Sequence, residues 1–241
     1  MKYLTLAASL MAGTAMAGEA VTYSAEGRDF EGYMAMAEDA KGTVLIVHDW
    51  DGLTQYEKDR ADMLAEMGYN AFAVDLYGAG VRPDSVEGNR AETEKLYNDR
   101  EMMRALTLAG LDAAKEQGMG DAILAGYCFG GAVALEMALA QPEGIVGYAS
   151  FHGSFGDAVN QDYAGVDVPM RIYHGGADEA VPMSDLAALV EAFEASGTPY
   201  KAEVYYGAPH AFSVIGSDRY NEEADKRSWA DFDAFLQEEF G

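Results

Sequence analysis

Six strand-length apolar runs, separated by helical patterns, constrain the fold of this chain more than any other feature. The apolar runs lie at residues 44–47, 71–74, 122–125, 145–150, 169–173 and 202–206. Most of them are continuous rather than alternating, which indicates strands that are buried on both faces, as in a parallel sheet covered by helices. Helical patterns fill residues 55–67, 90–117, 130–140, 184–196 and 220–240. This alternation predicts an α/β fold with a mostly parallel central sheet.

Two helical segments indicate how the layers are arranged. Residues 131–140 are apolar on nearly every side and stop before Pro142, which predicts a central, buried helix. The last helix instead places Trp229, Phe232, Leu236 and Phe240 on one face, so we expect it to cover the sheet from outside. Helices on both faces would make a three-layer sandwich.

The chain start predicts a leader followed by one domain. Residues 1–17 combine a positive start, an apolar stretch and small residues before Ala17, as in a cleaved secretory signal peptide. Glu19 interrupts the apolar stretch too early for a membrane anchor. No repeat or long linker divides residues 18–241, where a short antiparallel pair at 21–24 and 30–36 precedes the parallel strands. We therefore expect a single domain, exported to the periplasm or secreted, with no membrane span.

Charge and cysteine content exclude two classes of protein. Acidic residues outnumber basic ones 41 to 16, and the formal net charge of −25 would repel the phosphates of a nucleic acid. Cys128 is the single cysteine, so no disulfide can form within the chain. A lone cysteine is most often a small buried hydrophobe, and that structural alternative stands beside any catalytic one.

The segment around Cys128 has the pattern of a nucleophile turn. Residues 126–131 read Gly-Tyr-Cys-Phe-Gly-Gly, which fits Gly-x-nucleophile-x-Gly with cysteine in the serine position. A sharp strand-to-helix turn leaves no space for a Cβ beside the nucleophile, which explains the flanking glycines. The following helix would direct backbone N–H groups and its positive dipole end at the sulfur.

Two further residues complete a nucleophile, acid, histidine order. Asp178 and His210 lie in loops that follow predicted strands, and the carboxyl ends of such strands converge at one edge of an open α/β sheet. In that arrangement His210 would take the thiol proton and later activate water, while Asp178 would orient the imidazole. The backbone N–H of Phe129 and one N–H from the loop 48–52 would stabilise the oxyanion.

These segments resemble the dienelactone hydrolases of the α/β-hydrolase superfamily. The resemblance covers most of residues 18–241 and rests on the Cys128 turn and three more motifs: Asp-Leu-Tyr at 75–77, Gly-x-x-Asp-x-x-Val-Pro at 175–182, and Pro-His-x-Phe at 209–212. It implies an α/β-hydrolase fold and a triad of Cys128, Asp178 and His210. The oxyanion donors of the family fall on the N–H groups of Phe129 and Trp50.

The resemblance also marks departures at the substrate site. Asp49 stands where the family carries a glutamate that helps to activate the cysteine, and a solvated loop carboxylate is the alternative. The family's two carboxylate-binding arginines fall on Ala79 and Val214, so the clamp is missing unless Arg82 replaces it. Apolar pocket walls are expected from a set of aromatic residues: Trp50, Phe129, Phe155 and Phe212.

The expected activity is hydrolysis of a small carboxylic ester or lactone, without a cofactor. His48, His152 and His174 also follow strands, but no metal-binding spacing appears, and we expect no metal. Two alternatives remain open: a binding or scaffold protein on the same framework, and a redox-sensing thiol protein. The oligomeric state is not predicted from the sequence.

Overall fold

The computed structural model describes residues 17–241, apart from the side chains of residues 157 and 159. The predicted signal segment, residues 1–17, lies outside the described residues except for its last residue. Its cleavage and the export of the protein stay predictions.

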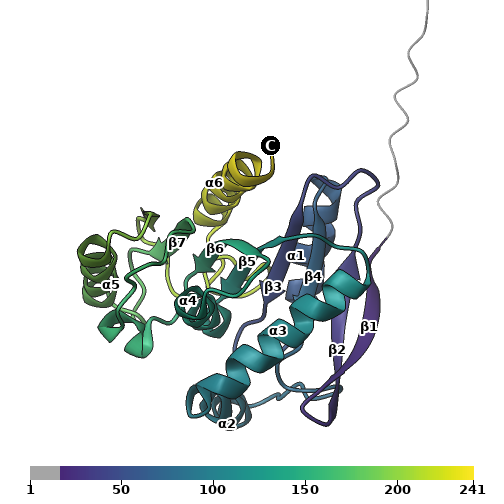
Figure 1. Cartoon of the computed structure of the whole chain (residues 1–241). Helices are drawn as coiled ribbons and strands as arrows, with labels where there is room; N and C mark the ends of the chain where they lie inside the picture. The colour runs from purple at the N-terminus through teal and green to yellow at the C-terminus, as the bar shows by residue number, and fades with distance from the viewer. Residues whose placement is uncertain (1–16) are drawn as a thin grey trace, which may run out of the picture.

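An eight-stranded sheet forms the centre of the molecule (Figure 1). Its strands run in the order β1-β2-β4-β3-β5-β6-β7-β8, and all pairs are parallel except β1 with β2 and β2 with β4. The strand bounds are β1 Glu19–Ala25, β2 Arg28–Ala35, β3 Thr43–Val47, β4 Asn70–Val74, β5 Ala122–Tyr127, β6 Ile145–Phe151, β7 Met170–Gly175 and β8 Tyr200–Tyr205. The expected parallel sheet with an antiparallel edge pair is thus confirmed.

Helices cover both faces of this sheet. Their bounds are α1 Gln55–Glu66, α2 Val86–Tyr97, α3 Arg100–Glu116, α4 Phe129–Ala140, α5 Met183–Ser196 and α6 Glu222–Phe240, with the short 3-10 helix η1 at Gly156–Asn160. The helices α2 to α5 pack into one hydrophobic cluster, whereas α1 and α6 pack into another on the opposite face. This is the three-layer α/β-hydrolase fold that the sequence predicts.

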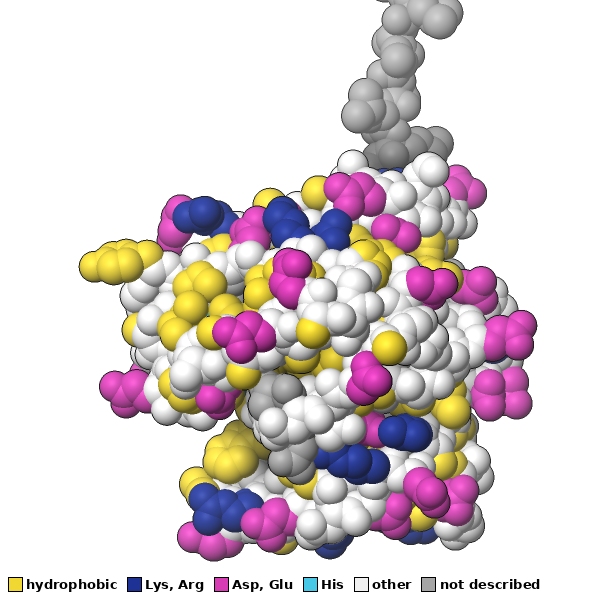
Figure 2. Space-filling view, turned by 60° about the vertical axis from the view of Figure 1, so that its left-hand side comes forward, with side chains coloured by type: hydrophobic (Ala, Val, Ile, Leu, Met, Phe, Trp, Pro, Cys, Tyr) yellow, Lys and Arg dark blue, Asp and Glu magenta, His cyan; other side chains and the backbone are white. Residues whose placement is uncertain are grey.

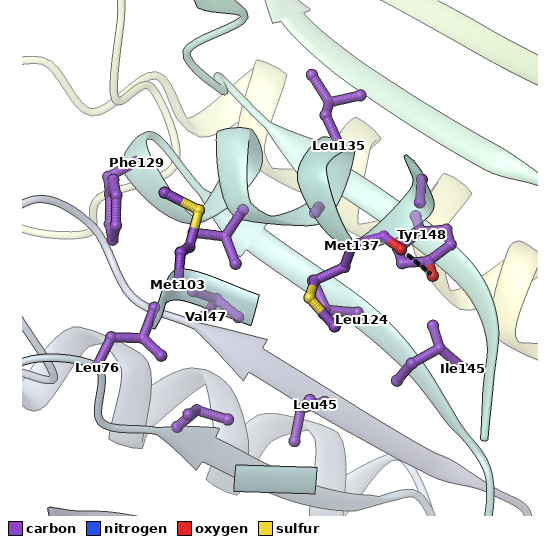
Figure 3. Packing of buried hydrophobic residues seen from close by; sticks show 14 of the residues in the cluster. Leu45, Val47, Leu76, Met103, Leu124, Phe129, Leu135, Met137, Ile145 and Tyr148 are labelled. Atoms are coloured by element: carbon purple, nitrogen blue, oxygen red, sulfur yellow. Dashed lines mark hydrogen bonds between the residues drawn. The ribbon is translucent and has the colours of Figure 1, made fainter. Parts of the chain in front are cut away.

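Alternate residues of the central strands face the two clusters. Leu45 and Val47 of β3 join the cluster beneath α4, while Val44 and Ile46 face α1 and α6. Figure 3 shows Leu45, Val47 and Leu124 on the strand face that α4 crosses. Both faces of β3 are buried, which is why its sequence reads as an unbroken apolar run.

The prediction of one continuous helix over residues 90–117 is wrong. The structure breaks it into α2 and α3 at Asn98 and Asp99. The Asp99 carboxylate accepts the backbone N–H of Met102 at 2.9 Å and thereby caps a new helix. Asn and Asp bond readily to nearby backbone groups, and here that preference outweighs the continuous apolar periodicity.

The helix α4 is central and buried, as its composition predicts, and it carries one buried acid. The Glu136 side chain is paired with two arginines of α3: Arg100 Nη1 lies 2.5 Å from Oε2, and Arg104 Nε lies 2.6 Å from Oε1. Two guanidinium groups offset the cost of burying this carboxylate. The pairing fixes α3 against the helix that follows Cys128.

The surface of the molecule is acidic. Figure 2 shows Asp and Glu side chains spread over one face, where they outnumber Lys and Arg. Within residues 17–241, no helix is both long and apolar enough to cross a membrane.

Candidate active site

Cys128 lies at a sharp turn between β5 and α4. Its φ of +50° is in the left-handed region that non-glycine residues rarely adopt. A Cβ on Gly126 would lie 1.9 Å from the Gly130 carbonyl oxygen, and a Cβ on Gly130 would lie 2.2 Å from the Val47 carbonyl oxygen. Both glycines are therefore required by close backbone approach, and the turn leaves the cysteine partly exposed.

The structure brings Cys128, His210 and Asp178 into one hydrogen-bonded row. His210 Nε2 lies 3.1 Å from Cys128 Sγ, and His210 Nδ1 lies 2.8 Å from Asp178 Oδ2. Asp178 follows β7 and His210 follows β8, so both come from loops at the carboxyl edge of the sheet. The His210 side chain is 13% exposed to solvent, whereas the Asp178 side chain is 0% exposed.

Asp178 is held as a carboxylate. Its other oxygen accepts the N–H groups of Ala180 at 2.9 Å and Val181 at 2.8 Å. Burial raises the pKa of Asp178, but the hydrogen bond and charge of His210 outweigh it and leave the pKa below its usual value. An ionised Asp178 requires the proton of neutral His210 on Nδ1, which leaves Nε2 as an acceptor facing the sulfur.

The Cys128 thiol and the Asp49 carboxyl lie side by side and affect each other's pKa. Burial raises the pKa of the Cys128 thiol well above its ordinary value, and the charge of Asp49 raises it further. Burial likewise raises the pKa of Asp49, against hydrogen bonds from the Trp50 N–H and the Cys128 thiol. The two groups therefore resist being charged together, and the thiol has two acceptors within reach, His210 and Asp49.

The two expected oxyanion donors differ in their present partners. The Phe129 N–H is directed at the Cys128 sulfur, where it favours the thiolate. The Trp50 N–H instead donates to Asp49 Oδ1 at 2.5 Å. The Trp50 loop itself is held by the Tyr77 hydroxyl, which donates to the Trp50 carbonyl at 2.9 Å. The Trp50 N–H is therefore occupied by Asp49 in this structure.

Of the expected pocket walls, only Trp50 has accessible surface. Phe155 and Phe212 are 2% and 0% exposed and belong to the two core clusters, and Phe129 is buried as well. Phe212 packs against the His152 ring at a centroid distance of 5.2 Å, so it supports the site from behind. Aromatic residues close to a motif in sequence can face either the crevice or the core, and spacing alone does not distinguish them.

Arg82, the suggested replacement for the missing clamp, is used within the fold. Its guanidinium donates to the carbonyl oxygens of Leu53 at 2.5 Å and Val81 at 2.7 Å, and it pairs with Asp75 at 3.3 Å. These contacts tie the loop after β4 to the loop before α1. They leave this arginine with a structural role.

The remaining strand-end histidines are buried and neutral. His48 accepts the Leu76 N–H on Nε2 at 3.2 Å and donates from Nδ1 to the Asp49 carbonyl at 2.6 Å, and burial lowers its pKa to about 4. Burial also lowers the pKa of His174, whose ring lies 5.5 Å from Phe155. No group of three His, Cys, Asp or Glu side chains among residues 17–241 is arranged to hold a metal ion.

Several residues around Cys128, His210 and Asp178 were not predicted from the sequence to lie at this site. Arg219 is exposed, and its charge acts on Cys128 and Asp49 and lowers the pKa of both against the larger effect of burial. Tyr97 of α2 packs edge-on against Phe129 at a centroid distance of 5.4 Å. Ser213 and His152 form a hydrogen bond beside His210. None of these positions belongs to a motif, and only the fold brings them to the site.

Comparison with known proteins agrees with this architecture. Residues 30–240 match the model of the dienelactone hydrolase family. The chain is 25% identical over 204 residues to Protein usf of Aquifex pyrophilus, covering 81% of this chain and 87% of that protein. A provisional carboxymethylenebutenolidase of Aquifex aeolicus is 24% identical over 204 residues, with the same coverage of 81% and 87%.

Solved structures show the same fold. A dienelactone hydrolase-like promiscuous phosphotriesterase from metagenomic libraries superposes with a TM-score of 0.82 at 24% identity, covering 95% of this chain and 100% of that one. The dienelactone hydrolase of Anabaena variabilis superposes with a TM-score of 0.69 at 18% identity, covering 93% and 98%. The family model spans the turn that carries Cys128 and the loops of Asp178 and His210. By sequence match and by fold, this chain belongs to the dienelactone hydrolase family of the α/β-hydrolase superfamily.

Proposed function

We propose that the protein hydrolyses a small carboxylic ester or lactone, with Cys128 as nucleophile, His210 as acid and base, and Asp178 as the group that orients His210. The observation that carries the proposal is the unbroken row of hydrogen bonds from Sγ through the imidazole to the Asp178 carboxylate. Membership of a hydrolase family supports the same reaction class. The partner is a small-molecule substrate.

The proposed reaction has two halves. In the first, Cys128 Sγ attacks the acyl carbon, its proton passes to His210 Nε2, and His210 returns that proton to the departing alcohol oxygen. An acyl thioester remains on Cys128. In the second half, His210 takes a proton from water and the resulting hydroxide attacks the thioester carbon. The C–S bond then breaks, His210 returns the proton to Cys128 Sγ, and the carboxylic acid is released. Asp178 stays ionised and stabilises the imidazolium in both halves.

Asp49 has a proposed role in the resting state. It accepts the Trp50 N–H and raises the pKa of Cys128, so it keeps the oxyanion donor occupied and the sulfur protonated. Displacement of the Asp49 carboxylate by a substrate carbonyl would free the Trp50 N–H. A freed N–H joined to that of Phe129 would stabilise the oxyanion, each donor by about 3 kcal/mol.

The family's carboxylate clamp is not transferred to this chain. Ala79 and Val214 occupy its positions, and Arg82 is bonded to backbone carbonyls and Asp75. The relative from Aquifex aeolicus carries the name of a lactone hydrolase, and the lactone is one candidate substrate class here, beside simple esters. Export to the periplasm or outside the cell remains part of the proposal.

The test is hydrolysis of a short acyl ester and a lactone by the purified protein and three variants. Cys128→Ala and His210→Gln should each lose roughly 10³-fold or more in kcat, because both halves of the reaction pass through these atoms. Asp178→Asn should also fall steeply, while the matched control Asp185→Asn, a carboxylate in the first turn of α5, should not. Turnover retained in both Cys128→Ala and His210→Gln would refute the proposal.

Two other results would support the alternative functions. A parent protein that hydrolyses none of the substrates, and whose thiol reacts slowly with an alkylating agent at every pH, is a binding or scaffold protein. A parent that forms a stable sulfenic acid on Cys128 without hydrolysing any substrate is a redox-sensing protein.

A further inference from the structure

A buried polar cluster lies directly behind His210, with Ser213 at its centre. Ser213 is fully buried and stands three residues after His210, in the segment between β8 and α6. Its hydroxyl lies 2.6 Å from the Tyr56 hydroxyl and 2.8 Å from His152 Nε2, while its carbonyl accepts Arg60 Nη2 at 2.7 Å. Side chains from α1 and from the end of β6 thus converge on the segment that carries His210.

The far end of the cluster is anchored in α6. Arg60 is 1% exposed and forms an ion pair with Asp225, whose other oxygen accepts the Tyr220 hydroxyl at 3.1 Å. The Arg60 guanidinium also lies over the Trp229 ring, 4.7 Å from its centroid. A buried ion pair adds little net stability compared with apolar packing, but it specifies one arrangement of the groups it binds.

The Arg60 guanidinium favours one direction for the hydrogen bonds between Tyr56, Ser213 and His152. Arg60 is a donor and never an acceptor, and its Nε donates to the Tyr56 hydroxyl at 3.3 Å. The Tyr56 proton is then free for Ser213 Oγ, and the Ser213 proton for His152 Nε2. The opposite direction, from His152 Nε2–H through Ser213 to the Tyr56 oxygen, would leave the Tyr56 proton without an acceptor, because the other contact of that oxygen is the Arg60 donor. His152 Nδ1 has no protein partner in either direction. The Arg60 donor thus favours the His152 tautomer with its proton on Nδ1.

His152 connects the cluster to the catalytic imidazole. Its ring meets that of His210 edge-on, with centroids 5.6 Å apart and planes at 69°. His152 adopts a φ of +40° and Ala211 a φ of +62°, so the backbone on both sides of this contact is in a conformation that needs support. Burial lowers the pKa of His152 well below its ordinary value, and the positive charges of His210 and Arg60 lower it further. An uncharged ring can lie beside His210 without repelling its protonated form.

We propose that Ser213 is a positioning residue, whose hydroxyl, oriented by Tyr56 and bound to His152, holds the His210 imidazole in line with Cys128. The inference rests on the proposed function, because positioning matters only if His210 transfers the thiol proton. A misplacement of a catalytic group by about 1 Å can lower the rate of the chemical step about 10²-fold. The loss of a single buried hydroxyl that positions the imidazole can therefore have a measurable effect on kcat.

The kinetic test compares Ser213→Ala and Tyr56→Phe with a matched control. Each variant should lower kcat for a short acyl ester about tenfold or more and change KM by less than about twofold, because the transition state and not substrate binding depends on His210. The double variant should lose no more than the worse single variant, since both residues act through one chain. The control is Tyr148→Phe, which removes a buried hydroxyl that donates to the Met137 carbonyl at 3.0 Å in α4 and should leave kcat unchanged.

A second readout requires no turnover. Nitrogen NMR spectra of ¹⁵N-histidine-labelled protein should show His152 as the Nδ1–H tautomer in the parent and in Tyr148→Phe. In Ser213→Ala this single tautomer should be lost, and the resonances of His210 should shift. Absence of any hydrolysis by the parent would contradict the proposed function, while the spectra still decide the present inference. An Nε2–H tautomer in the parent, or Ser213→Ala with parental kcat and unchanged His210 resonances, would overturn it.

Discussion

The Cys128 thiol has two possible proton acceptors, His210 and Asp49, and they affect its ionisation in opposite ways. Transfer to His210 Nε2, 3.1 Å away, makes a nucleophile, whereas Asp49 opposes ionisation of the thiol by its charge. The chain thus combines a base that can remove the proton with a neighbour that disfavours its removal at rest. Such an arrangement limits adventitious alkylation or oxidation of a thiol that stands partly exposed.

Replacement of Asp49 tests this balance at the scale of one residue. Asp49→Asn removes a negative charge beside Cys128, so the pKa of the thiol should fall and more thiolate should exist at neutral pH. The rate of alkylation by iodoacetamide near neutral pH should rise roughly tenfold for each unit by which the pKa falls. Asparagine can still accept the Trp50 N–H, so the loop keeps that contact.

The matched control is Asp51→Asn, which removes the neighbouring carboxylate of the same loop. Burial and the charge of Asp49 raise the pKa of Asp51 to about 6, but Asp51 is not among the groups that act most on Cys128. Its alkylation profile should follow that of the parent. An unchanged or slower reaction of Asp49→Asn would show that Asp49 does not hold the thiol protonated.

Among the elements, the start of α1 is connected through its capping residues to the loop that carries Asp49 and Trp50. Glu57 accepts the N–H of Thr54 at 2.8 Å and its hydroxyl at 2.9 Å in a capping box, and its other oxygen accepts the Asp49 N–H at 3.2 Å. One buried carboxylate therefore fixes the helix start and the backbone of Asp49 together. Burial raises the pKa of Glu57 to about 7 in spite of these hydrogen bonds.

This pKa predicts a stability that falls as the pH rises. The folded-state pKa of about 7 lies above the ordinary value of 4.5, so the folded state holds the Glu57 proton more tightly than the unfolded state does. Its stabilising contribution is complete below about pH 4.5 and is lost as the pH rises to about 7. The loss is on the order of 3 kcal/mol in the free energy of unfolding.

Denaturant unfolding of Glu57→Gln at several pH values measures this contribution. The variant should show a decline between about pH 4.5 and pH 7 that is smaller than that of the parent by the Glu57 contribution, while Asp51, whose pKa is raised to about 6, contributes to the decline in both proteins. Glu87→Gln is the control, because Glu87 is an exposed acid in the first turn of α2. A decline of equal size in the parent and in Glu57→Gln would assign the pH dependence to other groups.

For the whole molecule, the periodicity of apolar residues in the sequence was sufficient to predict most of the strands and helices. The apolar run at 44–47 became β3 at Thr43–Val47, and the apolar helix at 130–140 became α4 at Phe129–Ala140. These elements are predictable because burial on both faces leaves an unambiguous pattern in the sequence. The break between α2 and α3 was not predicted, because a single capping residue, Asp99, is a short local signal within a long stretch of helix-forming residues.

The site was predictable where topology alone determines it. Residues 128, 178 and 210 follow parallel strands, so their convergence at one sheet edge required only the strand order. The contacts that orient them were not predictable, because Arg60 meets Ser213 and Asp225 across 153 and 165 positions of chain. The direction in which a side chain points was also not predictable at two positions. The Asp49 carboxylate turns toward the Trp50 N–H, and the Phe212 ring packs into the core instead of lining a pocket.

In the proposed reaction, Cys128 carries the acyl group during turnover. Mass spectrometry of the purified protein, quenched in acid during hydrolysis of a slowly deacylating ester, tests it in one measurement. We expect a mass increase equal to one acyl group, located on the peptide that contains Cys128 and absent from Cys128→Ala. Rapid hydrolysis with no adduct on that peptide, or with an adduct on another residue, would contradict it.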